Sequence, residues 1–339
     1  MGPKKKDAPK GGGAEGVEGE DPKVLLSNYQ KFAKAIGLVP NPKLATQLND
    51  EEKYPITQII IDDDAGPMGP GGTRALMTAI MGTGPGMKGG PYKKLNSIRM
   101  WRTNVGDEGT SAVSEVLRLG GAEVQISYLE LLDNNISIKG CMALGSALSI
   151  GGNRSLLTLK LDYNLSIGTA GVDYLCRGLR TNSTLKQLHL AYCGLDHEAA
   201  VFISSVLANT KSGLTQLNLQ GNKLTGIGLG YLCVGLLNNN KLEKLNLADN
   251  MIDQSDEDLV GIASFRDCLM AETSNINSVD LMYNRIGESG AKILAEALTP
   301  TNKKVNEFLV DLTLPMHAFD LIFRRGAGKK GKKGKKKKK

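Results

Sequence analysis

The side chains best suited to catalysis or metal binding are few and widely spaced in this sequence. The three histidines, His189, His197 and His317, include no pair at the H-x-x-x-H spacing that puts two ligands on one helix face. The cysteines are odd in number and form no C-x-x-C pair; they are Cys141, Cys176, Cys193, Cys233 and Cys268. This pattern predicts a reducing compartment, without a zinc ribbon or a disulfide framework. We therefore expect no catalytic residue, no metal ligand and no enzyme activity.

Two glycine-rich stretches and a run of aspartates resemble ligand-binding loops but lack their defining order. Neither residues 66–73 nor residues 82–90 follow the G-x-x-x-x-G-K-[ST] order of a phosphate loop. In the second stretch, Lys88 is followed by glycine instead of Ser or Thr. We interpret the second stretch as an inserted flexible loop. The three aspartates at 62–64 have no companion ligands and indicate a solvated strand edge. No cofactor is expected.

The formal charge of +7 is concentrated near the C-terminal end. Residues 324–339 hold eleven Lys or Arg and no acid, and residues 1–22 carry a net −1, which leaves −3 for residues 23–323. Such a tail suits an acidic polymer, namely nucleic acid, acidic protein tails such as those of tubulin, or an anionic membrane. Without interleaved aromatic residues, sequence-specific reading of nucleic acid is not expected. A nuclear localisation signal and a solubilising tail remain alternatives. The candidates for binding an acidic surface are Arg324, Arg325, Lys329, Lys330, Lys332, Lys333, Lys335, Lys336, Lys337, Lys338 and Lys339.

The chain divides by composition into four segments. Residues 1–22 are rich in Gly, Lys and Glu and are expected to be disordered, as is the Lys-rich tail at 324–339. Residues 23–55 form a helical N-terminal cap, with short helices expected over 24–36 and 43–52. Residues 56–323 form the main domain. No apolar run approaches 18 residues and no apolar segment follows the basic start, so we expect neither a membrane span, a secretory signal nor a lipid anchor.

An apolar pattern recurs through the main domain. Its clearest copy places Leu214, Leu217 and Leu219 before Asn222 and Leu224, and a helical pattern follows. Copies start at residues 56, 95, 126, 156, 185, 214, 242, 276 and 305, at intervals of 28 to 39 residues. The two longest intervals, after residues 56 and 242, indicate insertions, and the second lengthens a helix around residues 257–272. Repeats of this length indicate a solenoid rather than two or three separate domains.

Each residue type that recurs in the pattern has a physical role within its unit. The apolar residues at the fourth and sixth positions alternate along a short strand and point inward. The Asn amide satisfies backbone groups where the chain turns away from the sheet, and the later Gly permits close backbone approach. Leucines four apart line one helix face. The units therefore stack into an α/β solenoid, a horseshoe with a parallel concave sheet, outer helices, and about eight repeats plus a terminal strand.

These repeats resemble the leucine-rich-repeat family, of the long ribonuclease-inhibitor-like type, over residues 56–313. Members that share the Pro-Lys-Lys-Lys start, such an array and a Lys-rich end look like structural components of motile cilia. The resemblance implies a non-enzymatic scaffold whose solenoid binds a protein partner in the cytoplasm, at the axoneme of a cilium or flagellum, with the tail on the microtubule. The array is also similar to Ran GTPase-activating proteins, whose acidic C-terminal region this chain lacks. A nuclear adaptor is the third alternative.

In this register, alternate strand residues project from the concave sheet. The single tryptophan, Trp101, lies there beside Arg99 and near Tyr128, and these three residue types are enriched at binding hot spots. The surface is mixed in charge and moderately polar. The partner-binding candidates are Arg99, Trp101, Tyr128, Glu130, Lys160, Asp162, His189 and Lys244.

Overall fold

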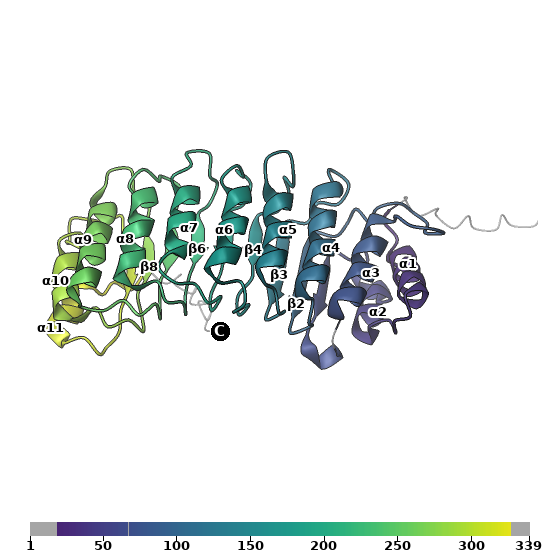
Figure 1. The fold of residues 1–339 in the computed structure, drawn as a ribbon, viewed down its shortest axis with the longest axis horizontal. Coiled ribbons are helices and arrows are strands. Elements are labelled where there is room, and N and C mark those ends of the chain that lie inside the picture. Colours follow the sequence, from purple (N-terminus) through teal and green to yellow (C-terminus); the bar gives the residue numbers. More distant parts are fainter. Residues whose placement is uncertain (1–18, 67, 327–339) are drawn as a thin grey trace, which may run out of the picture.

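The computed structural model describes residues 19–66 and 68–326. Within them, nine short strands form one sheet, every neighbouring pair parallel and the order that of the chain (Figure 1). This confirms the predicted α/β solenoid with its terminal strand. The strands are β1 (Gln58–Ile61), β2 (Ser97–Trp101), β3 (Tyr128–Leu132), β4 (Thr158–Lys160), β5 (Gln187–His189), β6 (Gln216–Asn218), β7 (Lys244–Asn246), β8 (Ser278–Asp280) and β9 (Glu307–Leu309).

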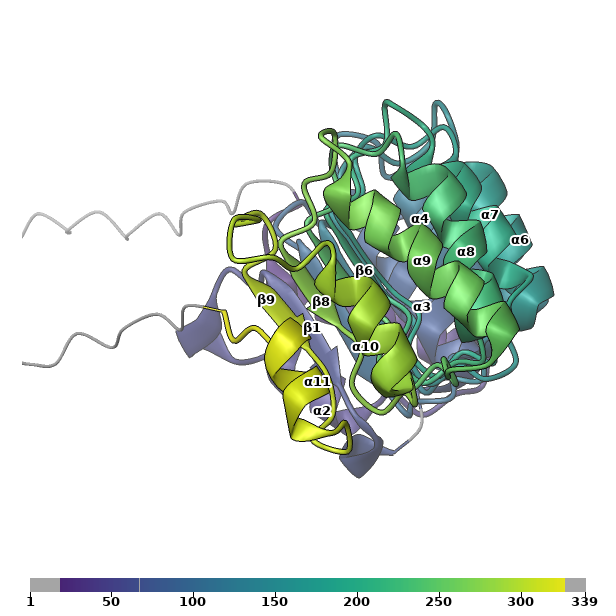
Figure 2. The ribbon, with the colours of Figure 1, turned by 90° about the vertical axis from the view of Figure 1, so that its left-hand side faces the viewer.

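In the part of the chain that the structure describes, the repeat helices lie together on one side of the sheet. Figure 2 shows the repeat helices together on that side, with the first and last units displaced toward the uncovered side, so the uncovered face is concave. A helix is wider than the spacing between strands, and stacking such units bends the array in this sense. The helices are α1 (Pro22–Ala35), α2 (Pro42–Leu48), α3 (Gly69–Met81), α4 (Gly106–Leu119), α5 (Ile138–Leu148), α6 (Gly168–Leu179), α7 (Ala199–Leu207), α8 (Thr225–Leu236), α9 (Asp256–Met270), α10 (Gly287–Ala295) and α11 (Met316–Ile322).

The predicted strand register is confirmed along the sheet. The apolar residue at the fourth position of each unit pairs with its equivalent in the next unit, as Leu188 does with Leu217. These residues are at most 2% exposed in all nine strands, and together with the helix leucines they form one continuous core. Alternate residues on either side of them are held on the opposite face by the period of the strand.

The repeated asparagines join each unit to its neighbour, and Asn164 illustrates the geometry. Its Oδ1 accepts hydrogen bonds from the backbone N–H groups of Asn134 and Ile136, at 2.9 and 3.0 Å. Its Nδ2 donates to the carbonyl oxygens of Leu131 and Leu161, both at 2.8 Å. One amide thus satisfies four backbone groups in two units that the turn would otherwise leave buried without partners.

Helices and a connecting loop close the N-terminal end of the solenoid. Helix α1 begins one residue after Asp21, whose carboxylate accepts a hydrogen bond from the N–H of Lys23 as an N-cap. The Tyr29 hydroxyl accepts from the N–H of Asn41 at 2.9 Å and links α1 to the start of α2. Residues 82–91, predicted to be an inserted loop, contact α1 through the hydrogen bonds of Asn28 with Lys88. Residues 1–18 of the predicted N-terminal segment lie outside the described residues.

The C-terminal end corrects one assignment. Arg324 was predicted to belong to the free basic tail, but its backbone pairs antiparallel with Phe308 of β9. Its guanidinium donates to the carbonyl oxygens of Thr299, Asn302 and Val305 at 2.6 to 2.8 Å. These bonds occupy the guanidinium, and the backbone pairing covers the last edge strand. Arg324 is therefore a structural residue rather than a ligand for an acidic surface. Residues 327–339, with all nine lysines of the tail, lie outside the described residues.

Candidate functional site

The concave face is built from the residues that flank the buried centre of each strand. In register across β2, β3, β4 and β5, Arg99 pairs with Glu130, Glu130 with Lys160, and Lys160 with His189. All four side chains are half-buried, because neighbouring strands lie only about 4.8 Å apart and each side chain shields the next. A row of charged and aromatic groups thereby lies on a rigid sheet.

Four of the predicted residues make direct contacts, and we call Arg99, Tyr128, Glu130 and Lys160 the Arg99 cluster. The Arg99 guanidinium lies over the Tyr128 ring, 4.7 Å from its centroid. The Tyr128 hydroxyl donates a 2.6 Å hydrogen bond to Glu130, and burial together with this bond raises the pKa of Tyr128. Lys160 lies 3.6 Å from the same carboxylate. Glu130 is therefore shared by the tyrosine and the lysine, and Arg99 is held by its ring contact.

Asp162 and His189 adjoin the cluster and have opposite pKa shifts. Burial raises the pKa of Asp162 to about 6, although its carboxylate accepts a 2.7 Å hydrogen bond from the Ala191 N–H. Burial, and then the charge of Lys160, lower the pKa of His189 to about 4. Both shifts favour the neutral form in the folded protein, because charge is costly where neighbouring side chains exclude water.

These two shifts predict compensating effects of pH on stability. The native Asp162 carboxyl binds protons more tightly than the unfolded one, so its contribution falls as the pH rises from about 4 to about 6. His189 binds protons less tightly when folded, so its contribution rises between about pH 4 and pH 6.5. Relative to wild type, Asp162→Asn should make the free energy of unfolding increase by up to about 3 kcal/mol over this range, and His189→Gln should make it decrease by a similar amount. Urea denaturation at pH 4 and 6.5 measures both changes, and parallel curves for all three proteins would contradict the assignment.

Trp101 lies on the same strand as Arg99 but in a more open position. Its ring is 49% exposed, and the guanidinium of Arg102 lies 5.4 Å from its centroid. Arg102 is in turn paired with Asp133 at 2.9 Å and Asp63 at 3.7 Å. The tryptophan therefore borders the Arg99 cluster at the end of β2, with one edge accessible from solvent.

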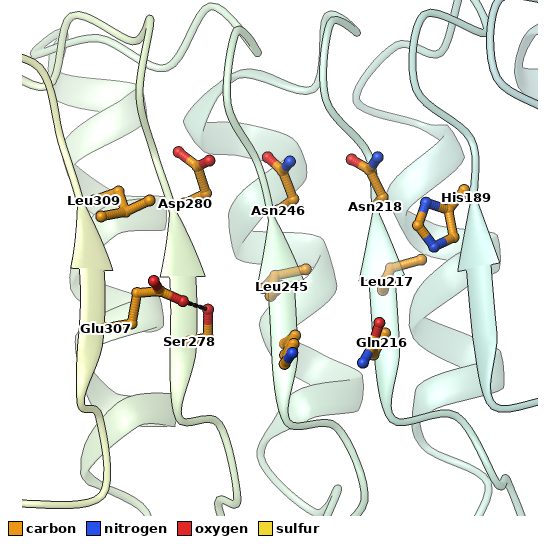
Figure 3. Close-up of a pocket in the computed structure, with 11 residues that line it drawn as sticks. His189, Gln216, Leu217, Asn218, Leu245, Asn246, Ser278, Asp280, Glu307 and Leu309 are labelled. Carbon is orange, nitrogen blue, oxygen red and sulfur yellow. Dashed lines mark hydrogen bonds between the residues drawn. The ribbon is translucent and has the colours of Figure 1, made fainter. Parts of the chain in front are cut away.

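Lys244 is separated from the other predicted residues. It lies on β7, three strands beyond Lys160, at a shallow hollow of about 230 Å³ over strands β5 to β9 (Figure 3). The same hollow is lined by His189, Asp280 and Glu307, the last of which accepts a 2.6 Å hydrogen bond from Ser278. The hollow therefore carries two carboxylates, Asp280 and Glu307, which are not among the predicted site residues.

The cysteines and histidines considered for catalysis lie in surroundings that are typical of structural residues. All five cysteines are buried and free, and burial raises the pKa of Cys141 to about 12, which disfavours a reactive thiolate. His197 contacts the Tyr231 ring, and His317 lies 3.2 Å from Glu288. Within the described ranges, no group of three or more His, Cys, Asp or Glu is placed to hold a metal ion. None of the helices there is long and apolar enough to cross a membrane.

Comparison with known proteins bears on this repeated architecture. The profile of the family described as Leucine Rich repeat matches residues 181–204, 213–233 and 274–295, which span strands and helices of three units. Ribonuclease inhibitor from Mus musculus is 28% identical over 219 residues, covering 63% of this chain and 46% of the inhibitor. The chain is a leucine-rich-repeat protein of the ribonuclease-inhibitor-like type.

Other similar proteins contain comparable repeats within much longer chains. NACHT, LRR and PYD domains-containing protein 5 of Homo sapiens is 31% identical over 210 residues, which are 61% of this leucine-rich-repeat protein but 16% of the human one. The chain thus spans less than half the length of the curated relatives named here. Among solved structures, leiomodin-1 actin-binding site 2 is similar with a TM-score of 0.38 and 18% identity, over 47% of this chain and 88% of that one.

Proposed function

We propose that this leucine-rich-repeat protein is a non-enzymatic scaffold that binds a protein partner on its concave face. The observation that supports this most is the uncovered sheet face with its half-buried arginine, tyrosine and lysine, because Tyr and Arg are residue types that dominate protein interfaces. A face of nine parallel strands also suits an extended protein surface better than a small molecule.

The scaffold, in this proposal, is attached to an acidic surface through its basic C-terminal segment. After removal of Arg324 from the set, the segment retains Arg325 and nine lysines, while residues 23–323 carry a net −3. This separation of charge favours contact through the tail rather than through the folded body. We propose that the surface is that of tubulin, in the microtubules of a cilium or flagellum.

A microtubule co-sedimentation experiment tests the role of the tail. Replacing its nine lysines by glutamine in the full-length chain should weaken binding at least about tenfold at low salt, because the cationic charge is lost. Wild-type binding should also weaken steeply as the salt concentration rises, whereas the residual binding of the variant should not.

The matched control replaces three exposed lysines of the folded body by glutamine. Lys139, Lys211 and Lys241 are exposed, and their replacement should leave sedimentation unchanged. Equal sedimentation of wild type and tail variant would remove the tail from the mechanism. Expression of the tagged chain in ciliated cells tests the site of action, and accumulation in the nucleus instead of along the axoneme would support the nuclear adaptor.

A further inference from the structure

The Arg99 guanidinium is a half-buried cation without an acceptor. Across residues 19–66 and 68–326, no hydrogen bond or ion pair engages it, and its Nε is buried without a partner. Glu130 faces it in register but is engaged by Tyr128 and Lys160. A guanidinium offers five N–H donors, and leaving them unpaired next to a sheet is unfavourable. A ligand that supplies an acceptor would therefore satisfy a donor that the folded protein leaves unpaired.

A second unpaired donor lies beside the first. Ser97 is two residues before Arg99 on β2, so both side chains project from the concave face. Ser97 is 7% exposed, and its Oγ has no partner among the described residues. Lys160 adds a third donor group, since its ammonium has three N–H bonds and the carboxylate of Glu130 lies 3.6 Å from it. The Ser97 hydroxyl, the Arg99 guanidinium and the Lys160 ammonium can all donate a hydrogen bond, which selects for a ligand that accepts them. The buried Nε2 of His189 also has no partner among the described residues, and in one tautomer of the neutral ring it is a donor as well.

The contacts of Arg99 also constrain the shape and charge of that ligand. The contact with the Tyr128 ring holds the guanidinium over that ring, and its planar fork matches the two oxygens of a carboxylate. Glu130 offsets one of the two cations, Arg99 and Lys160, so the cluster has a small excess of positive charge. A singly charged carboxylate therefore fits it better than a doubly charged phosphate.

We propose that Ser97, Arg99 and Lys160 form a receptor site for an aspartate or glutamate side chain of the partner protein. The inference rests on the proposed binding of a partner to the concave face and names the chemistry of its anchor. Glu130 competes with the incoming carboxylate for Lys160, so the site is partly self-blocked until the partner arrives.

Hexaglutamate is a suitable probe, and Trp101 is a built-in reporter. It is the single tryptophan of the chain and lies two residues beyond Arg99, about 7 Å along the strand. The titration uses the full-length chain with its nine tail lysines changed to glutamine, so that the peptide cannot bind the tail. Tryptophan fluorescence and the polarisation of labelled hexaglutamate then report on the folded body.

Variants of the cluster should change the affinity in opposite directions. Arg99→Gln should weaken hexaglutamate binding at least about tenfold, and Arg99→Lys should be intermediate because it keeps the charge but loses the fork. Glu130→Gln should strengthen binding, since it removes the internal competitor. Lys211→Gln, at an exposed turn after α7 outside the concave face, is the matched control and should leave the affinity unchanged. Arg99→Gln should not lower the melting temperature, whereas a structural role for Arg99 would require that it does.

Three results would overturn the proposal. The first is equal affinity for hexaglutamate of the tail variant with and without Arg99→Gln. The second is no binding of hexaglutamate to the tail variant with its Arg99 cluster intact. The third is binding of a hexaphosphoserine peptide at least about tenfold tighter than that of hexaglutamate. Any of them leaves the co-sedimentation result intact, because that result depends on the tail. Conversely, a tail variant that sediments like wild type would not affect the response of Trp101 to hexaglutamate.

Discussion

Replacement of Asn164 by alanine should lower the free energy of unfolding by about 4 kcal/mol. The side chain is 1% exposed and bonds to two N–H groups and two carbonyl oxygens of the backbone. Each buried backbone group left without a partner costs about 1–3 kcal/mol, and some of this loss is recovered when the turn relaxes. The damage extends over two units, because the amide joins β3 and β4 of the array.

Urea denaturation of the variant and two comparison proteins measures this effect. Asn238→Ala removes an exposed amide without a hydrogen bond to the described residues and should change stability by less than about 0.5 kcal/mol. Asn164→Cys should fall between the two, because Cys193 occupies the equivalent position of the next unit and its thiol donates to the carbonyl oxygens of Leu161 and Ala191. A loss below about 1 kcal/mol for Asn164→Ala would show that water or a relaxed turn replaces the amide.

The same repeated pattern explains why the fold was accessible from the sequence. Inward and outward positions follow from the period of a strand, so one aligned copy, such as Leu214 to Leu224, predicts the others. A second series of asparagines was nevertheless missed at the opposite turn. Asn153, Asn182 and Asn239 each donate to a carbonyl oxygen of the preceding unit and accept from an N–H group two residues before the next strand. In the sequence, this second series can be identified as an asparagine three residues before the first apolar position of the next repeat unit.

The candidate site was only partly accessible from the sequence. Periodicity indicates that Arg99, Glu130 and Lys160 share a face, but not which of two cations the carboxylate contacts, because that depends on side-chain rotamers. The repeat register placed Lys244 on the same face, although strand order separates it from the cluster. Arg324 was assigned to the tail by composition, and its partners are backbone carbonyls that carry no sequence signal. The register also places Ser97 on the concave face, but a small polar residue on a strand becomes a binding candidate only when its burial is known.

The helical layer sets the spacing of the strands that carry the site, and Gly178 is a sensitive point in it. Strands β3 and β4 are followed by helices α5 and α6, which approach each other closely at Gly145 and Gly178. A methyl carbon on Gly178 would lie 2.6 Å from the carbonyl carbon of Gly145 and 2.9 Å from its Cα, closer than side chains approach in real structures. Because the obstructing atoms are backbone, no rotamer change can relieve the contact, and the two helices must separate.

Gly178→Ala should therefore lower the free energy of unfolding by about 3 kcal/mol, as overpacking of a close interface does. Gly230→Ala in α8 is the matched control, because its nearest atom would be the Cα of Gly261 at an ordinary 3.6 Å. That substitution should be neutral or stabilise by about 0.5–1 kcal/mol through the higher helix propensity of alanine. If both variants unfold at the same urea concentration, the close contact between α5 and α6 does not determine the stability of the fold. Separation of these helices should also move β4 relative to β3, so Gly178→Ala should weaken hexaglutamate binding while Gly230→Ala leaves it unchanged.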